Sequence, residues 1–276
     1  MSCLDPHTAR DLVQCRLLGA IFSHSLRNEV VLKGGFAMRV MAGSVRYTKD
    51  LDLESYSSVP MKLVQNCIRK AIGDLRGSGL IADLTMTEPK QTETTQRWKI
   101  GGRVGDQDIH LTVEVSRRGA EPPEQIERTT YDSGDGLGPV PVACIALPSI
   151  SAAKVDCLLN PNREAPRDIY DLFLLIKMDI RPSPKAIAEY GRDRLVEMRE
   201  SLWAKLEKMD YEIARQSLLG FLPSEAAQSL TPEVWDEMRL VVDDKIREWL
   251  DEAINGDQGP PEETDRQNAE LAQIAV

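Results

Sequence analysis

VLKGGFAMRVMAGSVRYTKDLDLE (Val31–Glu54) begins with an apolar, β-branched segment and ends with two aspartates one residue apart. The first part, Glu29–Lys33, predicts a short strand that ends at a Gly-Gly turn. An amphipathic pattern after the turn predicts a short helix. Acid and leucine then alternate over Asp50–Glu54, and this period of two predicts a strand with two unlike faces. The stretch therefore predicts a strand, a turn, a helix and a second strand.

The two aspartates of the second strand are expected to share one face. Residues two apart in a strand project to the same side, so Asp50 and Asp52 point together while Leu51 and Leu53 enter the core. Two like charges this close repel each other unless a cation relieves them. Oxygen ligands suit Mg²⁺, so the pair is a candidate metal site. A solvated acidic edge strand is the simpler alternative, because DxD alone is a weak motif.

Neighbouring residues favour a site for a metal-bound phosphate. Backbone N–H groups at the Gly34-Gly35 turn, together with the helix N-terminus that follows, are suited to holding phosphate. Arg46 and Lys49 flank the acids and supply positive charge. A later acidic strand over residues 109–115 adds Glu114 as a third carboxylate if it lies beside the first strand.

The composition is that of a globular protein with excess acid. The chain has 276 residues, of which 42% are hydrophobic and 28% charged, so it can bury a substantial core. The net charge of −10 argues against broad nucleic-acid binding, but part of the acid lies beyond residue 255, and the body can still present a basic cleft. Five scattered cysteines form no CxxC pair and indicate reduced thiols in a cytoplasmic protein. We expect no signal peptide and no membrane span.

The character of the sequence changes near Pro148. Before it, helices are expected from Pro6 and from Pro60, and three further strands over 80–86, 97–100 and 109–115. After it, the pattern predicts only helices, over 149–159, 166–178, 184–208, 211–221 and 231–254. We therefore expect an α/β domain over 1–147, a helical domain over 148–255 and a flexible tail over 256–276.

Two separated blocks carry a resemblance to a known family. The first is VLKGGFAMRV…RYTKDLDLE, and the second is VACIALPSISAAKVDCLLNPNREAPRDIYDLFLLIK over 142–177. The second block has a helical Lys154, a loop Arg163 and then R-D-x-x-D-L. Together they resemble the AbiEii/AbiGii-type nucleotidyltransferase toxins, a branch of the DNA polymerase β-like superfamily, over residues 28–178. Many polymerase β-like enzymes have Gly-Ser where this chain has Gly-Gly-Phe, and Gly-Gly is typical of the toxin branch.

The resemblance implies an α+β fold, in which a mixed nucleotidyltransferase sheet with packed helices is followed by a C-terminal helical bundle that completes the cleft. It implies transfer of a nucleoside monophosphate from an NTP to an acceptor hydroxyl, with Mg²⁺ or Mn²⁺ as cofactor. The implied roles are catalysis by Asp50, Asp52, Lys154 and Asp168, nucleotide binding by Gly34, Gly35, Arg46, Lys49 and Lys154, metal binding by Asp50, Asp52 and Glu114, and support by Thr48, Arg167 and Asp171.

The residues of the second block can also be explained without a catalytic role. A lysine beside an apolar helical stripe usually extends its ammonium to solvent, and Lys154 fits that pattern. Asp168 suits the first turn of a helix that begins at Pro166. Asp171 can pair with Arg167 on the helix surface.

The resemblance also implies a biological setting. The chain would be the toxin of a bacterial toxin–antitoxin or phage-defence pair, with tRNA as acceptor and a separate antitoxin protein as partner. Lys62, Arg69 and Arg76 recur every seven residues on one expected helix face and are candidates for an RNA-binding wall. Two alternatives stay open: a nucleotidyltransferase of small molecules such as an antibiotic, and a non-catalytic nucleotide-binding module.

Overall fold

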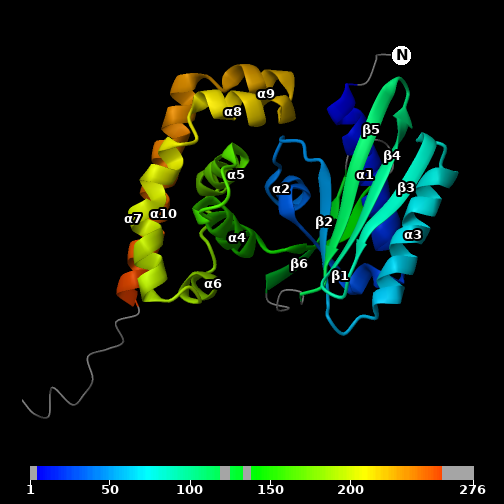
Figure 1. Cartoon of the computed structure of the whole chain (residues 1–276), viewed down its shortest axis with the longest axis horizontal. Coiled ribbons are helices and arrows are strands. Elements are labelled where there is room, and N and C mark those ends of the chain that lie inside the picture. Colours follow the sequence, from blue (N-terminus) through cyan, green and yellow to red (C-terminus); the bar gives the residue numbers. More distant parts are fainter. Residues whose placement is uncertain (1–4, 119–124, 133–137, 257–276) are drawn as a thin grey trace, which may run out of the picture. The chain divides into compact units, whose positions relative to one another are not determined.

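The structure is a computed structural model that describes residues 5–118, 125–132 and 138–256. The expected tail lies outside the described residues from 257 onward. The chain divides into two compact units, which we call the sheet unit and the helical unit (Figure 1). The sheet unit comprises Met1–Ile150 and Glu212–Thr231, and the helical unit comprises Ser151–Tyr211 and Pro232–Val276.

Seven strands of the described chain form one mixed sheet in the order β3-β4-β5-β2-β1-β7-β6. Their bounds are β1 Val30–Lys33, β2 Asp50–Ser55, β3 Ala82–Gln91, β4 Thr95–Val104, β5 Gln107–Ser116, β6 Ile126–Tyr131 and β7 Val140–Ile145. Strand β2 is antiparallel to β1 and parallel to β5, while β7 is parallel to β1. The pattern predicted the first five strands but neither β6 nor β7. Pro141 within β7 weakens the strand signal, since proline removes a ladder donor.

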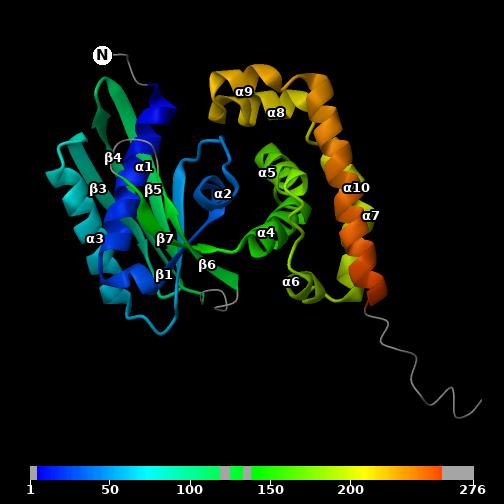
Figure 2. The same ribbon diagram turned by 180° about the vertical axis from the view of Figure 1, so that it is seen from behind.

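The two faces of the sheet differ in character as β2 was predicted to show. Leu51 and Leu53 are fully buried, whereas Asp50 and Asp52 are only partly buried. The long helices α1 (Pro6–Ser23) and α3 (Met61–Gly77) lie side by side against the apolar face (Figures 1 and 2). The acids therefore lie on the opposite face of the sheet. Asp5 caps α1, as its sequence predicts, by accepting the His7 N–H at 2.9 Å.

The remaining helices of the sheet unit include a segment that comes late in the chain. They are η1 Ser25–Asn28, α2 Gly34–Ala42, α8 Tyr211–Ser217, whose first residue belongs to the helical unit, η3 Leu219–Phe221 and α9 Ser224–Ser229. The sequence pattern assigned 212–231 to the helical part, but this segment groups with the sheet. The cause is docking by Phe221, whose carbonyl accepts the Tyr47 N–H at 2.8 Å and whose ring lies 5.0 Å from the Lys49 ammonium.

The helical unit is built on α4 Leu147–Leu159, whose first residues belong to the sheet unit, and on α5 Pro166–Lys177, α6 Pro184–Ala188, α7 Arg192–Glu207 and α10 Pro232–Gly256. The continuous helix expected over 184–208 is interrupted: α6 ends at Ala188, and α7 begins after Gly191, whose φ of 72° is not helical. Helix α10 packs along α7 and α5. The indole of Trp235 secures it by donating to the Met209 carbonyl at 2.9 Å. Within the described ranges, no helix is both long and apolar enough to cross a bilayer.

Candidate active site

The Gly-Gly turn is required because the Asp52 side chain occupies the space beside it. Lys33 and Asp52 are register partners on β1 and β2, so Gly34 follows directly next to the aspartate. A Cβ atom at Gly34 would lie 3.0 Å from the Cβ of Asp52 and closer still to its carboxylate. Gly34 also has a φ of 71°, which favours glycine. The glycine thus lets α2 begin directly beside a carboxylate.

The second glycine makes room for two other predicted residues. A Cβ at Gly35 would lie 3.2 Å from the Arg46 guanidinium and 3.2 Å from the Thr48 hydroxyl. Arg46 and Thr48 are both buried, and the Arg46 Nη1 donates to the Tyr47 carbonyl at 3.1 Å. The structure therefore brings Gly34, Gly35, Arg46 and Thr48 together at the start of α2.

A row of charged residues crosses four neighbouring strands on the acid-bearing face. Strand registers align Arg97 of β4, Glu114 of β5, Asp52 of β2 and Lys33 of β1. The two outer cations reach neighbouring acids: Arg97 donates through Nε to Glu114 at 2.7 Å, and Lys33 pairs with Glu54. Strand β5 thus lies beside β2, as the proposed role of Glu114 requires.

The Asp50 end of the site contains a cation that the sequence did not indicate. Arg10 of α1 donates through Nε to the His110 carbonyl at 3.1 Å. One of its two terminal nitrogens, Nη1, is shielded from solvent and has no hydrogen-bond partner among the described residues. Burial lowers the pKa of Arg10, and the negative charge of Asp50 opposes that shift. Lys49, expected to bind phosphate, places its ammonium over Phe221. No spacing in the sequence links Arg10 to Asp50, because α1 precedes β2 by a long connection.

The aspartate pair suits a divalent metal that also binds substrate. Asp50 and Asp52 are half-buried carboxylates on one face, and hard cations prefer oxygen ligands. In the part of the chain that the structure describes, no group of three or more His, Cys, Asp or Glu side chains lies close enough to hold a metal. Mg²⁺ commonly takes one or two carboxylates and completes its shell with phosphate and water. The residues fit that pattern, whereas Glu114 would have to release Arg97 to become a third ligand.

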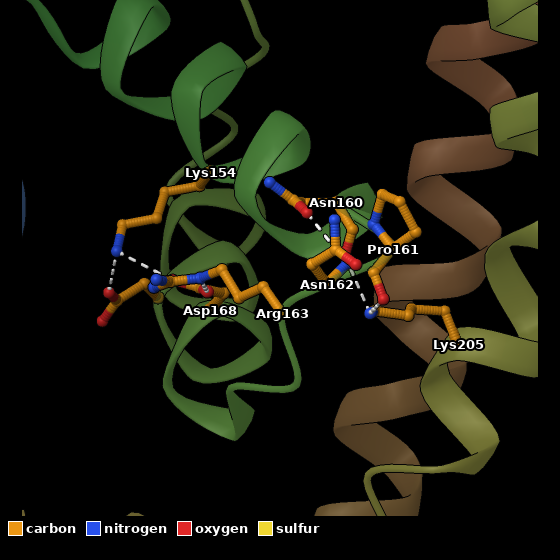
Figure 3. Close-up of polar contacts among 8 residues, drawn as sticks. Lys154, Asn160, Pro161, Asn162, Arg163, Asp168 and Lys205 are labelled. Atoms are coloured by element: carbon orange, nitrogen blue, oxygen red, sulfur yellow. Dashed lines mark hydrogen bonds and ion pairs between the residues drawn. The ribbon is translucent and has the colours of Figure 1, made fainter.

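The second motif block forms a buried ion cluster in the helical unit. The Lys154 ammonium lies 2.6 Å from Asp171 and 3.2 Å from Asp168. Arg163 donates to Asp168 through Nε at 2.7 Å and Nη2 at 3.2 Å, and this hydrogen bonding raises the pKa of Arg163. Figure 3 shows Lys154 and Arg163 converging on the same carboxylate. The two aspartates are only 1% and 0% exposed.

The buried cluster contradicts the interpretation in which Lys154 and Asp171 are surface residues. Lys154 is 9% exposed and does not extend into solvent. Asp168 lies in the first turn of α5, as expected. Asp171 is buried and pairs with Lys154, while Arg167, its expected partner, is exposed. The i, i+4 pattern did not find this pairing because Lys154 comes from a different helix.

The predicted basic stripe of α3 lies away from the aspartates. Arg69 forms a bidentate pair with Glu88 at 2.7 Å for both contacts, and Glu88 also accepts from the buried Trp98 indole. Trp98 is a register partner of Val113, on the apolar face of the sheet. The stripe of Lys62, Arg69 and Arg76 is therefore on the opposite side of the sheet from Asp50.

Solved structures share this mixed sheet and the helices packed on it. The crystal structure of JHP933 from Helicobacter pylori aligns with a TM-score of 0.61 and 14% identity over 100% of both chains. A second H. pylori structure, described as a candidate nucleotidyltransferase, aligns with a TM-score of 0.61 and 16% identity over 91% of this chain and 98% of that one. At this identity the likeness concerns the fold alone.

The family follows from the sequence. The model of the family described as "Nucleotidyl transferase AbiEii toxin, Type IV TA system" matches residues 16–262. The chain belongs to this family of nucleotidyltransferase toxins, and the resemblance seen in the two motif blocks is confirmed. A search of curated proteins gave no match. Arg10 lies before the matched residues.

Proposed function

We propose that this toxin-family enzyme transfers a nucleoside monophosphate from an NTP to a hydroxyl of RNA, with tRNA as the acceptor. It would act in a toxin–antitoxin or phage-defence pair, and a separate antitoxin protein would neutralise it. The observation that carries the proposal is the placement of Asp50 and Asp52 on one sheet face, with Gly34 opening α2 directly against Asp52.

The sheet unit supplies the groups that such a transfer needs. Asp50 and Asp52 would hold Mg²⁺ or Mn²⁺, which when bound polarises the phosphate and neutralises developing charge. The N–H groups of Gly34 and Gly35 lie in the first turn of α2, where the helix dipole favours a phosphate. Arg46 and Thr48 border this turn and would orient the phosphates, together with Lys49, which follows Thr48 in the chain.

Lys154 is the cation of the helical unit that we assign to the nucleotide phosphates. Its ammonium is fixed by Asp168 and Asp171, so its position is set before a ligand arrives. A preorganised charge binds an anion without the cost of ordering a flexible side chain. In this proposal Asp168 positions Lys154, and Asp171 contributes to the same cluster.

We assign RNA binding to two exposed lysines on the acid-bearing face of the sheet, Lys90 and Lys99, in place of the stripe on α3. Lys99 of β4 is in register with Thr112 and, through it, with Asp50. Lys90 of β3 is in register with Arg97 on the same face, and both lysines are exposed. Exposed lysines that flank a reaction centre suit the sugar–phosphate backbone of an acceptor.

Incubation of the purified protein with each labelled NTP, Mg²⁺ and total tRNA, followed by a denaturing gel, tests the activity. We expect one NTP to label tRNA and chelation of Mg²⁺ to abolish the label. If a small molecule such as an antibiotic acquires the label and RNA does not, the small-molecule alternative is favoured. Tight NTP binding without transfer to any acceptor would favour a non-catalytic module.

The assignment of RNA binding to Lys90 and Lys99 has its own test. Contacts to phosphates make the affinity for RNA fall steeply with salt, by a logarithmic slope of roughly 0.7 for each single-strand phosphate contact. The variant Lys90→Gln/Lys99→Gln should weaken labelling of tRNA and flatten its salt dependence. The matched control Lys62→Gln/Arg76→Gln removes two charges from the opposite side and should change neither. Equal effects of the two variants would contradict the assignment of RNA binding to Lys90 and Lys99.

A further inference from the structure

The loop between α4 and α5 is held by a buried lysine that the motifs do not include. Lys205 of α7 is 9% exposed. Its ammonium donates to the Asn160 carbonyl at 2.8 Å and to the Pro161 carbonyl at 3.4 Å, rather than to a carboxylate (Figure 3). Burial lowers the pKa of Lys205, because a low-dielectric environment disfavours its charge. A buried ammonium carries a desolvation cost, which its hydrogen bonds to the two loop carbonyls offset in part.

The same loop carbonyl connects Lys205 with Arg163. The Asn160 carbonyl accepts the Lys205 ammonium and also the Arg163 N–H at 3.1 Å. The loop turns back on itself there, because the Asn162 N–H donates to the Asn160 side chain at 2.9 Å. Lys205 therefore fixes the point of the backbone from which the Arg163 side chain extends.

Arg163 in turn sets the charge around Lys154. Asp168 accepts both Arg163 and Lys154, and Asp171 accepts Lys154. Two cations and two carboxylates balance in this cluster. Without Arg163, Lys154 would face two carboxylates alone, and the cluster would carry one net negative charge. Such a cluster would repel phosphate.

We propose that Arg163, anchored through its loop by Lys205, is a positioning residue that keeps the Lys154 ammonium available to the nucleotide phosphates. This inference rests on the proposed contact between Lys154 and nucleotide. Neither Arg163 nor Lys205 need touch the substrate. Each acts through the next group, along the path from Lys205 through the Asn160 carbonyl and Arg163 to Asp168 and Lys154.

A purely structural role predicts different data from a positioning role. If the contacts only stabilise the helical unit, their loss lowers the melting temperature and leaves the KM for NTP of the folded protein unchanged. If they position Lys154, their loss raises that KM, and the effect depends on Lys154 being present. The two roles are thus separated by kinetics on folded protein and by double-mutant coupling.

The experiment measures kcat and the KM for NTP in the labelled-transfer assay, with melting temperature measured in parallel. Arg163→Gln and Lys205→Met should each raise KM, by roughly tenfold for Arg163→Gln and less for Lys205→Met. The double variant should resemble Arg163→Gln alone, and neither change should raise KM further once Lys154→Gln is present. Arg163→Lys retains the charge and should recover most of the loss, even if Arg163→Gln folds poorly.

Matched controls remove the same groups where no such path exists. Lys208→Met removes an exposed lysine three residues from Lys205, and Arg181→Gln removes an exposed arginine that pairs with Glu252 at 2.6 Å. Both should leave KM unchanged. An unchanged KM for Lys205→Met and Arg163→Gln, or effects that add to Lys154→Gln, would overturn the positioning role. If Lys154→Gln itself leaves KM unchanged, the assigned phosphate contact fails first, and the positioning role fails with it.

Discussion

The chain has two pairs of closely spaced aspartates, and their environments differ. Asp168 and Asp171 of the helical unit are almost fully buried and bind Lys154 and Arg163. Asp50 and Asp52 of the sheet unit are partly accessible and share a strand face. A buried carboxylate has lost its hydration and is stabilised by a cation of the protein. An accessible pair can instead take its cation from solution, so the first pair is suited to positioning and the second to metal chemistry.

The same chemical change should therefore have its largest effect on activity at the accessible pair. Asp50→Asn and Asp52→Asn each remove one charge from the proposed metal site. We expect transfer to fall about a thousandfold, which corresponds to roughly 4 kcal/mol of transition-state stabilisation. Circular dichroism and thermal melting should remain close to those of the parent protein. Asp83→Asn, at an exposed ion pair with Arg103, is the control and should retain full activity.

At the buried pair the same change should mainly affect stability. Asp171→Asn leaves the Lys154 ammonium with Asp168 as its remaining carboxylate in a buried cluster. Loss of one partner in a buried ion pair typically costs about 3 kcal/mol. Denaturant unfolding should show this loss for Asp171→Asn and almost none for Asp50→Asn. Equal stability of the two variants would remove the distinction between the pairs.

The glycine turn offers an intermediate test of the sheet site. Gly34→Ala adds a Cβ against Asp52, while Gly43→Ala adds one at a φ of 62° with no neighbour within 4 Å. Gly43→Ala should lower stability by roughly 1–2 kcal/mol, because alanine is disfavoured at positive φ, and Gly34→Ala should lower it further, because its Cβ also meets Asp52. Only Gly34→Ala should also impair transfer in the labelled-NTP assay. A similar loss of transfer in Gly43→Ala would show that backbone strain alone explains the effect.

The smallest effect is expected at Arg10. Its positive charge interacts with Asp50 and would offset part of the acidic charge of the site without being a metal ligand. Arg10→Gln should reduce kcat/KM by about threefold, or roughly 0.7 kcal/mol. Arg27→Gln, which removes a charge from η1, serves as a control. A thousandfold loss in Arg10→Gln would mean that this arginine contacts the reacting groups.

Local pattern predicted much of the fold and only part of the site. Proline and cap residues located α1, α5 and α10, and the alternation over Asp50–Leu53 predicted the strand and its faces. The motif blocks identified the family. Strand β7 was missed because its strand signal is short and contains Pro141.

The missed features depend on contacts between distant segments. The docking of Phe221 on Tyr47 and Lys49 joins residues more than 170 positions apart, and no local period encodes it. The pairing of Lys154 with Asp171 joins two helices, whereas the sequence offered a closer partner within one helix. The anchoring of a loop by Lys205 is likewise visible only in three dimensions.

The most direct test of the central claim is anomalous diffraction from crystals grown with Mn²⁺ and the NTP that labels the acceptor. The account predicts one or more manganese peaks at the carboxylates of Asp50 and Asp52, with the nucleotide phosphates completing the coordination. It predicts no manganese at Asp168 and Asp171, whose carboxylates are occupied by Lys154 and Arg163. Nucleotide bound without manganese at Asp50 and Asp52, or manganese at the buried pair, would contradict the account.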